Sequence, residues 1–487
     1  MNPVIIKGRN RLIAATINDG GMAAFPPPHS FYWARESEQV LGYGWYQKNK
    51  DGNFDFGIRQ AEYEEDPEFY HNFALYNARP GKWQRMPVFY YIDAHGGESA
   101  INSALKFTHG DQYKPLEGYK VMGHHYHVGF LKRLKEAGGL DQKINDIGAV
   151  KATGINIFSI IDGVRGSARH SKDIAFADEL HEYYEAARRH SDKDFLVMPN
   201  DENSTGGRPP FMGGHYDIII SKPLYWKPSR AEGQPLFTPH PTYGRVYNIQ
   251  SPMDLMKMTE EENVIISMPH PNTKRSTGYP EAIKDEPQFL HKNYFALGCR
   301  WGMGIDASEK RLGEYRFLSL WDQTNNWMAA NGRAPKFALA ISEARSDKGY
   351  RGKPVWDDIY GMSPVNYIKI DSVPSVEDMT SVVNALKNGA YFITTGEVLI
   401  PEFEIRDNGV SKTLVADVSW TFPLDFVEIV WGNGKDTDRK IIETSDLTAF
   451  GNKTFEIDFN PEGKKWIRFA AWDIATNGAL LQPVRLE

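Results

Sequence analysis

The spacing of hydrophobic and polar positions changes twice along the chain, which divides the sequence into three predicted units. Residues 1–117 lack a helical period and show short apolar runs between turn-rich pieces such as Phe25-Pro26-Pro27-Pro28. Apolar runs bounded by Gly, Pro, Asn and Asp are typical of strands joined by turns. The runs are residues 4–6, 11–16 and 88–92. We therefore expect an all-β N-terminal domain that resembles a sandwich.

Residues 118–398 alternate between short apolar runs and stretches with the period of a helix. Phe176, Leu180, Tyr184 and Ala187 recur at intervals of three or four residues, which predicts one buried helix face. Further helices are predicted at residues 130–135, 317–327 and 375–387. The predicted strands are residues 119–122, 155–161, 195–198, 216–221, 264–268, 301–305, 337–341 and 367–370. Such a long alternation predicts an α/β unit with a largely parallel sheet, closed into a barrel.

Residues 399–487 return to the period of strands. Alternation is clear at residues 425–431 and 465–472, and turn residues occupy 432–434 and 460–463. A third unit follows from this pattern, a C-terminal β-sandwich packed on the barrel.

The composition is that of a globular protein, with 41% hydrophobic and 24% charged residues. The net charge of −7 argues against general nucleic-acid binding, and no apolar run is long enough to cross a membrane. The single cysteine, Cys299, excludes an internal disulfide and a cysteine-based zinc site, and we expect it to be buried. No secretion signal opens the sequence. We expect a periplasmic or extracellular location if a leader has been removed, and a cytoplasmic one otherwise.

Histidines and carboxylates stand at the ends of several predicted strands. His125 and His127 follow the first strand, where an extended backbone would point both side chains to the same side. Because a parallel barrel gathers the carboxyl ends of its strands at one face, we expect a shared site there. Mixed His and carboxylate ligands suit Zn²⁺, Mn²⁺ or Fe²⁺, and the set is large enough for one to three ions. The candidate ligands are His125, His127, Asp162, Glu202, His215, His270 and Glu343.

Each candidate ligand also has a structural interpretation when it is taken alone. Asp162 could cap a turn, Glu202 could be solvated, and His270 could support a proline-rich loop. Among the remaining polar residues, Lys274 and Arg345 are candidates for contacts to an anionic substrate. His215 is a candidate for proton transfer as well as for metal binding.

At these positions the chain resembles the PHP (polymerase and histidinol phosphatase) metallohydrolases. The order His125-Tyr126-His127, Asp162, Glu202, His215 and Met268-Pro269-His270-Pro271 carries the resemblance. Residues 318–322 and 389–397 are similar to the subgroup named after the carbaryl hydrolases CehA and McbA. The resemblance covers about residues 118–400. It implies a distorted seven-stranded (β/α) barrel, two or three divalent ions, and hydrolysis of phosphoesters, esters or carbamates by metal-activated water.

Two positions depart from the family pattern. The family has a histidine two residues after the second-strand aspartate, where this chain has Val164, and an Asp-x-His pair where it has Glu343-Ala344-Arg345. Arginine stays protonated and cannot bind a metal.

Three functions therefore remain open from the sequence. The first is a metal-dependent hydrolase for a phosphoester or related ester. The others are a metal-assisted carbohydrate hydrolase or lyase, favoured by the aromatic β domains, and a non-catalytic binding protein on an eroded barrel. The expected partner is a small molecule or oligosaccharide, with no nucleic acid and no membrane.

Overall fold

The structure is a computed structural model of the chain. It describes residues 4–7, 13–17, 20–25, 33–34, 39–40, 42–51, 54–60, 89–110, 112–162, 174–204, 215–269, 271, 283–299, 317–342, 364–444, 446–475 and 477–486. The described part is a mixed α/β structure in which strands predominate. None of its helices combines the length and apolar character that crossing a bilayer requires.

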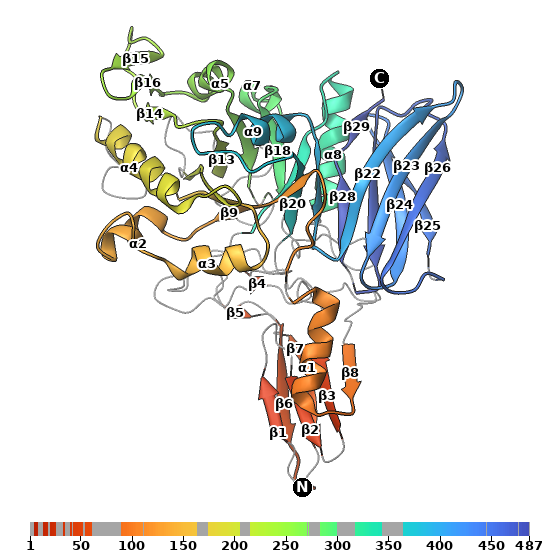
Figure 1. Cartoon of the computed structure of the whole chain (residues 1–487). Helices are drawn as coiled ribbons and strands as arrows, with labels where there is room; N and C mark the ends of the chain where they lie inside the picture. The colour runs from red at the N-terminus through yellow and green to blue at the C-terminus, as the bar shows by residue number, and fades with distance from the viewer. Residues whose placement is uncertain are drawn as a thin grey trace.

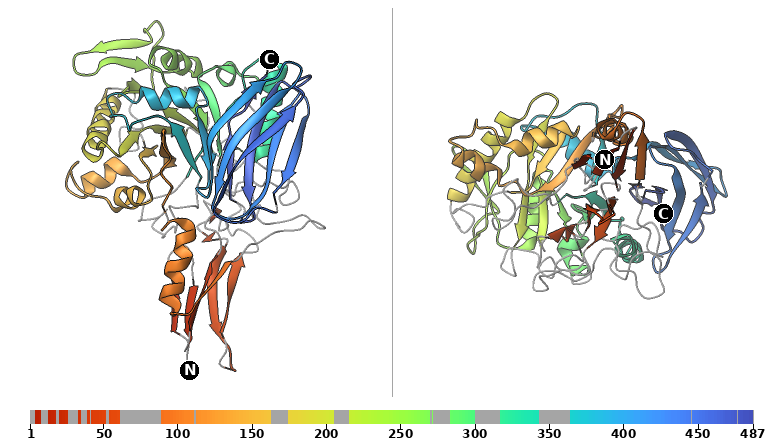
Figure 2. Two further views of the ribbon diagram at one scale, coloured as in Figure 1. Left: turned by 45° about the vertical axis from the view of Figure 1, so that its right-hand side comes forward. Right: turned by 90° about the horizontal axis from the view of Figure 1, so that it is seen from below.

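The N-terminal unit is a four-stranded antiparallel sheet with a helix on one face, and it projects from the rest of the molecule (Figures 1 and 2). The strand order is β1 (Val4–Lys7), β2 (Ile13–Ile17), β3 (Gly20–Phe25) and β8 (Phe89–Asp93). Between β3 and β8 in the sequence come two further strand pairs. They are β4 (Trp33–Ala34) with β5 (Gln39–Val40), and β6 (Gly42–Lys48) with β7 (Phe54–Gln60).

The helix of this unit, α1 (Gly97–Leu105), corrects the expectation of an all-β domain. It packs Ala100 and Ala104 against Ala14 and Ala23 of the sheet. Alanines bury little apolar area, so the helical period is weak in the sequence. The helix also starts very close to the sheet, since a Cβ at Gly97 would lie 2.8 Å from the Thr16 hydroxyl. The 3₁₀ turn η2 (Lys106–Thr108) then leads out of the unit.

The strands that carry the candidate site belong to two sheets. The larger sheet is ten-stranded, and its path is β11 (Leu196–Pro199), β10 (Ile157–Ile160), β9 (Tyr119–Tyr126), β20 (Val365–Lys369), β21 (Tyr391–Thr394), β28 (Gly478–Leu481), β27 (Trp466–Asp473), β24 (Leu424–Gly432) and β25 (Thr437–Glu443). Strand β29 (Val484–Arg485) pairs with β27 off this path. The second sheet is β12 (Asp201–Ser204), β13 (His215–Ile219), β17 (Ile265–Met268), β18 (Tyr294–Cys299) and β19 (Phe337–Ala340).

The expected closed, largely parallel barrel is not found in the described residues. Parallel pairs occur along β9–β10–β11 and β17–β18–β19. However, β20 is antiparallel to β9 and β21, and β13 is antiparallel to β12 and β17. The hydrophobic pattern reports that both faces of a strand are buried, and buried parallel and antiparallel strands share that signal.

The two sheets approach each other beside the ends of β9 and β10. On one side, the Asn200 N–H donates to the carbonyl of Ile160 (2.9 Å), in the step from β11 to β12. On the other side, the Ser342 N–H donates to the carbonyl of His124 (2.8 Å) after β19. The end of β9 is therefore held between both sheets.

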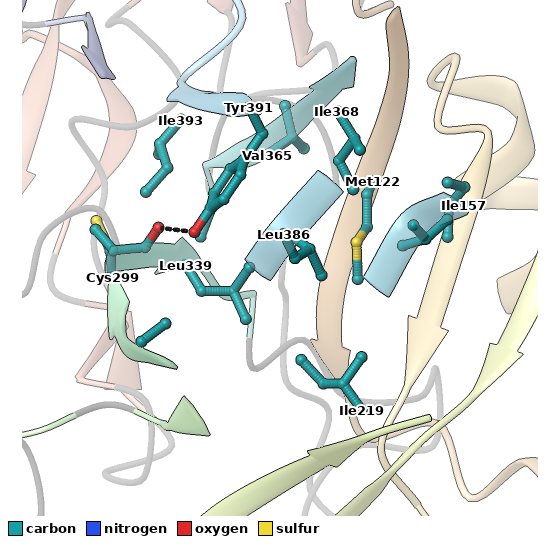
Figure 3. Close-up of a cluster of buried hydrophobic side chains, with 14 of the residues drawn as sticks. Met122, Ile157, Ile219, Cys299, Leu339, Val365, Ile368, Leu386, Tyr391 and Ile393 are labelled. Atoms are coloured by element: carbon teal, nitrogen blue, oxygen red, sulfur yellow. Dashed lines mark hydrogen bonds between the residues drawn. The ribbon is translucent and has the colours of Figure 1, made fainter. Parts of the chain in front are cut away.

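A single hydrophobic core fills the space between these sheets, and Figure 3 shows part of it. Met122, Ile157, Ile219 and Leu339 come from different strands and are fully buried. Burial of one such side chain contributes roughly 1.5–3 kcal/mol. The Tyr391 hydroxyl donates to the carbonyl of Ala338 (2.8 Å), the dashed line in Figure 3.

Helices cover the outer faces of the two sheets (Figure 1). They are α2 (Phe130–Glu136), α3 (Asn145–Ala152), α4 (Ala175–His190), α5 (Pro252–Glu261), α7 (Pro287–Leu290) and α9 (Thr380–Lys387). Helix α8 (Phe317–Ala330) instead packs against β24 and β25 of the ten-stranded sheet. A small sheet of β14 (Tyr225–Lys227), β16 (Gly244–Asn248) and β15 (Phe237–His240) lies beside α4. The buried face predicted for α4 is confirmed.

The start predicted for the last of these helices is wrong. Helix α9 begins at Thr380, whereas Ser375 and Asp378 form an isolated bridge in front of it. The Asp378 carboxylate accepts from the Thr380 N–H (3.1 Å), so this aspartate caps the helix from outside. The predicted strand at residues 301–305 lies outside the described residues, and β18 was not anticipated.

The C-terminal residues form strands throughout their described part. β22 (Val398–Asp407), β23 (Lys412–Trp420) and β26 (Gly451–Phe459) make a three-stranded antiparallel sheet. The turn predicted at residues 460–463 falls between β26 and β27, and the one predicted at 432–434 begins at the last residue of β24 and leads toward β25. The ten-stranded sheet crosses the boundary predicted at residue 398, because β28 pairs with β21.

Candidate metal centre

A β-bulge at the end of β9 places the first histidine of the site. In the ladder with β10, His124 is opposite Ser159 and Tyr126 is opposite Ile160, which leaves His125 as the extra residue. Its φ of 68° lies in the left-handed region, which costs a residue with a Cβ about 1–2 kcal/mol. The simple alternation expected for His125 and His127 is therefore interrupted. Both side chains nevertheless reach the same place, with ring centroids 5.0 Å apart.

Three buried side chains converge at this point. Nε2 of His125 lies 3.7 Å from Glu202 Oε1, and Nε2 of His127 lies 3.5 Å from Glu202 Oε2. All three residues are buried, so Glu202 is not solvated. These separations are long for hydrogen bonds. They are close to the ligand–ligand distance of about 3.4 Å that a tetrahedral ion with bonds of about 2.1 Å imposes.

A buried carboxylate from the second sheet stands behind the first histidine. Asp217, in the middle of β13, lies with its two oxygens 3.0 and 3.1 Å from His125 Nδ1. His124 Nε2 is 3.1 Å from Asp217 Oδ2, and the Ser267 hydroxyl donates to the same oxygen (3.2 Å). A carboxylate that receives three donors is well satisfied although it is fully buried.

These contacts also set the protonation states of Asp217 and His124. Burial raises the pKa of Asp217, but the electrostatic effect of His125 and the hydrogen bonds from His124 and His125 outweigh it and lower the pKa to about 2. Burial lowers the pKa of His124, against the opposing effect of Asp217. A neutral His124 beside an ionised Asp217 is the state that both shifts favour at neutral pH.

A chain of side chains supports His124 from the other side. The Asn200 amide donates to Ser159 Oγ (2.8 Å), and Ser159 Oγ is 2.7 Å from His124 Nδ1. Asn200 is itself fixed, because its Oδ1 accepts from the Ile220 N–H (3.0 Å). The network therefore links strands of both sheets around the bulge.

Asp162 accepts a hydrogen bond at the N-terminus of helix α2. Its Oδ2 accepts from the Phe130 N–H (2.9 Å) at the first turn of α2, where a negative charge is favourable. Asp162 is buried, and its backbone forms an isolated antiparallel β-bridge with that of Asp201, the residue after Asn200. It is absent from both groups of potential metal ligands in the described residues, which are His124 with His125 and Asp217, and His125 with His127 and Glu202. Its place among the ligands therefore stays a prediction.

The other predicted site residues are described only in part or not at all. The backbone of His215 opens β13 opposite Ser204, but its side chain is outside the description. The remaining positions lie outside the described residues, namely Val164, His270, Lys274, Glu343 and Arg345.

Sequence reasoning did not select two residues of the centre, His124 and Asp217. Alternation assigned His124 to the opposite side of the strand from His125, and the bulge removes that rule. A signal for Asp217 was present, since it interrupts the apolar run 216–220. A charge inside a buried strand requires compensating partners and is uncommon without a role.

The two other segments of the family resemblance contact different parts of the molecule. Asp322, at the end of the run 318–322, pairs with Arg468 of β27. Glu397, at the end of the run 389–397, is buried with its Oε2 3.2 Å from His109 Nε2. Their contacts join segments that are distant in the sequence.

Comparisons of the chain with protein-family models, curated proteins and solved structures gave no match in any of the three. The geometry of the centre and the sequence resemblance are therefore the two indications of function.

Proposed function

We propose that this protein is a metal-dependent hydrolase whose centre is built on His125, His127 and Glu202. The observation that supports this most directly is the convergence of these three side chains at ligand–ligand distances. Two of them come from the end of one strand, and the third comes from a strand of the second sheet. All three residues are buried, so their side chains converge inside the protein and not on its surface.

The donor set suits a catalytic ion. Two imidazoles and one carboxylate are the protein ligands of many hydrolytic zinc sites, which keep a position for water or substrate. The same mixture also suits Mn²⁺ and Fe²⁺. His125, His127 and Glu202 would hold a divalent ion, which would supply a water of lowered pKa, about 7, and Lewis acidity toward the substrate.

The residues of this chain supply the rest of the proposed mechanism. Glu202 would complete the ligand set, because its carboxylate lies opposite both histidines. His215, Lys274 and Arg345 keep the roles expected from the sequence, which are proton transfer for His215 and stabilisation of developing negative charge for the two basic residues. The proposed reaction class is hydrolysis of a phosphoester, ester or carbamate, for which the resemblance to PHP metallohydrolases is the support.

The test is an activity panel on the purified chain with added Zn²⁺ or Mn²⁺. Phosphomonoesters, phosphodiesters, aryl carbamates and acidic oligosaccharides represent the alternatives. We expect metal-dependent turnover of at least one of the first three. His127→Asn should abolish both turnover and bound metal. His181→Asn, which changes a half-buried histidine on α4, is the matched control and should retain both. Turnover in His127→Asn equal to that of the unaltered protein would exclude this centre as the active site.

A further inference from the structure

The two groups of potential ligands share His125, so they cannot both be metal sites with the same ring nitrogen. In the first group, Asp217 lies 3.0–3.1 Å from His125 Nδ1 and 3.1 Å from His124 Nε2. These are hydrogen-bond distances. In the second group, His125 faces Glu202 with its other nitrogen, at 3.7 Å. The ring therefore has one side toward a hydrogen-bonding carboxylate and the other toward a ligand set.

The donors around Asp217 fix which nitrogen carries the hydrogen. An ionised carboxylate only accepts hydrogen bonds, so each nitrogen that contacts it must be an N–H. His125 therefore carries its hydrogen on Nδ1. Its lone pair is then on Nε2, which faces Glu202 and His127.

The hydrogen bonds of His124 place it outside the ligand set. Asn200 donates to Ser159 Oγ, which leaves the Ser159 hydroxyl hydrogen for His124 Nδ1. His124 then keeps its hydrogen on Nε2, in the hydrogen bond with Asp217. Both nitrogens of His124 are thus used by the protein network.

On the basis of the proposed function, we infer that Asp217 is a positioning residue that fixes the tautomer and orientation of His125. The ion is then held by His125 Nε2, His127 and Glu202, and His124 anchors the carboxylate from behind. A carboxylate that accepts from the second nitrogen of a metal-binding histidine typically changes metal affinity by about 10- to 100-fold.

The inference is tested by Co²⁺ binding to the full chain after treatment with a chelator. Asp217→Asn keeps the shape of the side chain but presents an amide N–H₂ to one of the two histidines. We expect its dissociation constant for Co²⁺ to rise about 10- to 100-fold while the visible absorption band of bound Co²⁺ persists. Asp473→Asn is the matched control, since Asp473 is also fully buried and is hydrogen-bonded to Asn477 in the C-terminal unit. It should bind Co²⁺ as tightly as the unaltered protein.

A second pair of variants keeps the test decisive if Asp217→Asn does not fold. His124→Asn should retain Co²⁺ binding with a small loss, whereas His127→Asn should lose it. Ser267→Ala removes only the weakest donor to Asp217. Its affinity for Co²⁺ should lie between those of His124→Asn and of the unaltered protein. Loss of binding in His124→Asn with retention in His127→Asn would place the ion between His124, His125 and Asp217, and would overturn the inference.

The possible failures are distinguishable. A folded Asp217→Asn protein with unaltered Co²⁺ affinity overturns the positioning role and leaves the proposed hydrolase intact. An unaltered protein that binds no Co²⁺ overturns the proposed function itself.

Discussion

Asp322 on α8 and Arg468 on β27 form a buried bidentate ion pair. Arg468 Nε donates to Oδ1 of Asp322 (2.8 Å), and Nη2 donates to Oδ2 (2.7 Å). The guanidinium also lies 5.2 Å from the ring centroid of Trp321. The pair connects α8, the helix between β18 and β19 of the second sheet, to the C-terminal half of the ten-stranded sheet.

Removal of one partner of this pair should destabilise the protein strongly. Asp322→Ala leaves the buried Arg468 without its bidentate acceptor, and we expect a loss of about 3–5 kcal/mol in unfolding free energy. Replacement of both residues by apolar ones, Asp322→Leu with Arg468→Met, should recover most of the lost unfolding free energy. Denaturant titrations measure both values. Arg406→Ala, which breaks exposed ion pairs with Glu404 and Glu456, serves as control and should leave the unfolding free energy nearly unchanged.

The left-handed backbone at His125 predicts an inverted order of glycine and alanine variants. In the metal-free protein, His125→Gly should be more stable than His125→Ala by about 1 kcal/mol, because glycine adopts a φ of 68° without strain. His127 is not among the described residues with positive φ, so His127→Gly should be less stable than His127→Ala. Unfolding in the presence of a chelator gives both differences. The same order at the two positions would contradict the bulge.

Addition of metal should stabilise the protein only when its ligands are intact. A ligand that binds the folded state alone raises the unfolding free energy by about 2.7 kcal/mol at 100 times its dissociation constant. We expect Zn²⁺ or Mn²⁺ to raise the thermal midpoint of the chelator-treated protein. His127→Asn and Glu202→Gln should show no shift, whereas Glu182→Gln, on the outer face of α4, should behave as the unaltered chain does. An equal shift in Glu202→Gln would remove this carboxylate from the ligand set.

A buried lysine predicts a rise of stability with pH. Burial lowers the pKa of Lys336 to about 7 from its ordinary value of 10.5. Its ammonium donates to backbone carbonyls, among them those of Phe289 and Tyr294. Between these two pKa values the unfolded chain keeps a proton that the folded chain has released, so unfolding free energy should increase as pH rises.

The measurement is the unfolding free energy from pH 7 to pH 9 in the unaltered protein and in Lys336→Met. The difference between them should change with pH, with the unaltered protein gaining as pH rises. Lys369→Met replaces a half-exposed lysine and should leave the slope unchanged. A slope that is identical in Lys336→Met would show that the carbonyl acceptors keep Lys336 charged throughout.

The sequence predicts the strands and helices around the site better than their arrangement. The buried face of α4 was read correctly, because Phe176, Leu180, Tyr184 and Ala187 repeat at the helical period. Strand direction was not predictable, since β9 pairs with β10 in parallel and with β20 in antiparallel orientation, and buried strands of both kinds share the same apolar signal. Helix α1 was missed because its packing face is made of alanines.

The candidate site was predictable in part for a similar reason. His125, His127 and Glu202 could be selected by residue type and by their place after strands, and the structure brings them together. The roles of His124 and Asp217 depend on one extra residue in a ladder and on a strand from the other sheet. Neither role follows from periodicity, and only the charge of Asp217 inside an apolar run marks that residue in the sequence.

The pairing of β21 with β28 affects how the protein is made. On the ribosome, β9, β10, β11 and β20 emerge well before residues 478–481, and domains usually fold as they appear. Until β28 has been synthesised, the edge of β21 offers its backbone groups to any other extended chain. Nascent protein that already contains His125, His127 and Glu202 therefore has an incomplete sheet. The edge of β21 is therefore covered only in the last part of translation.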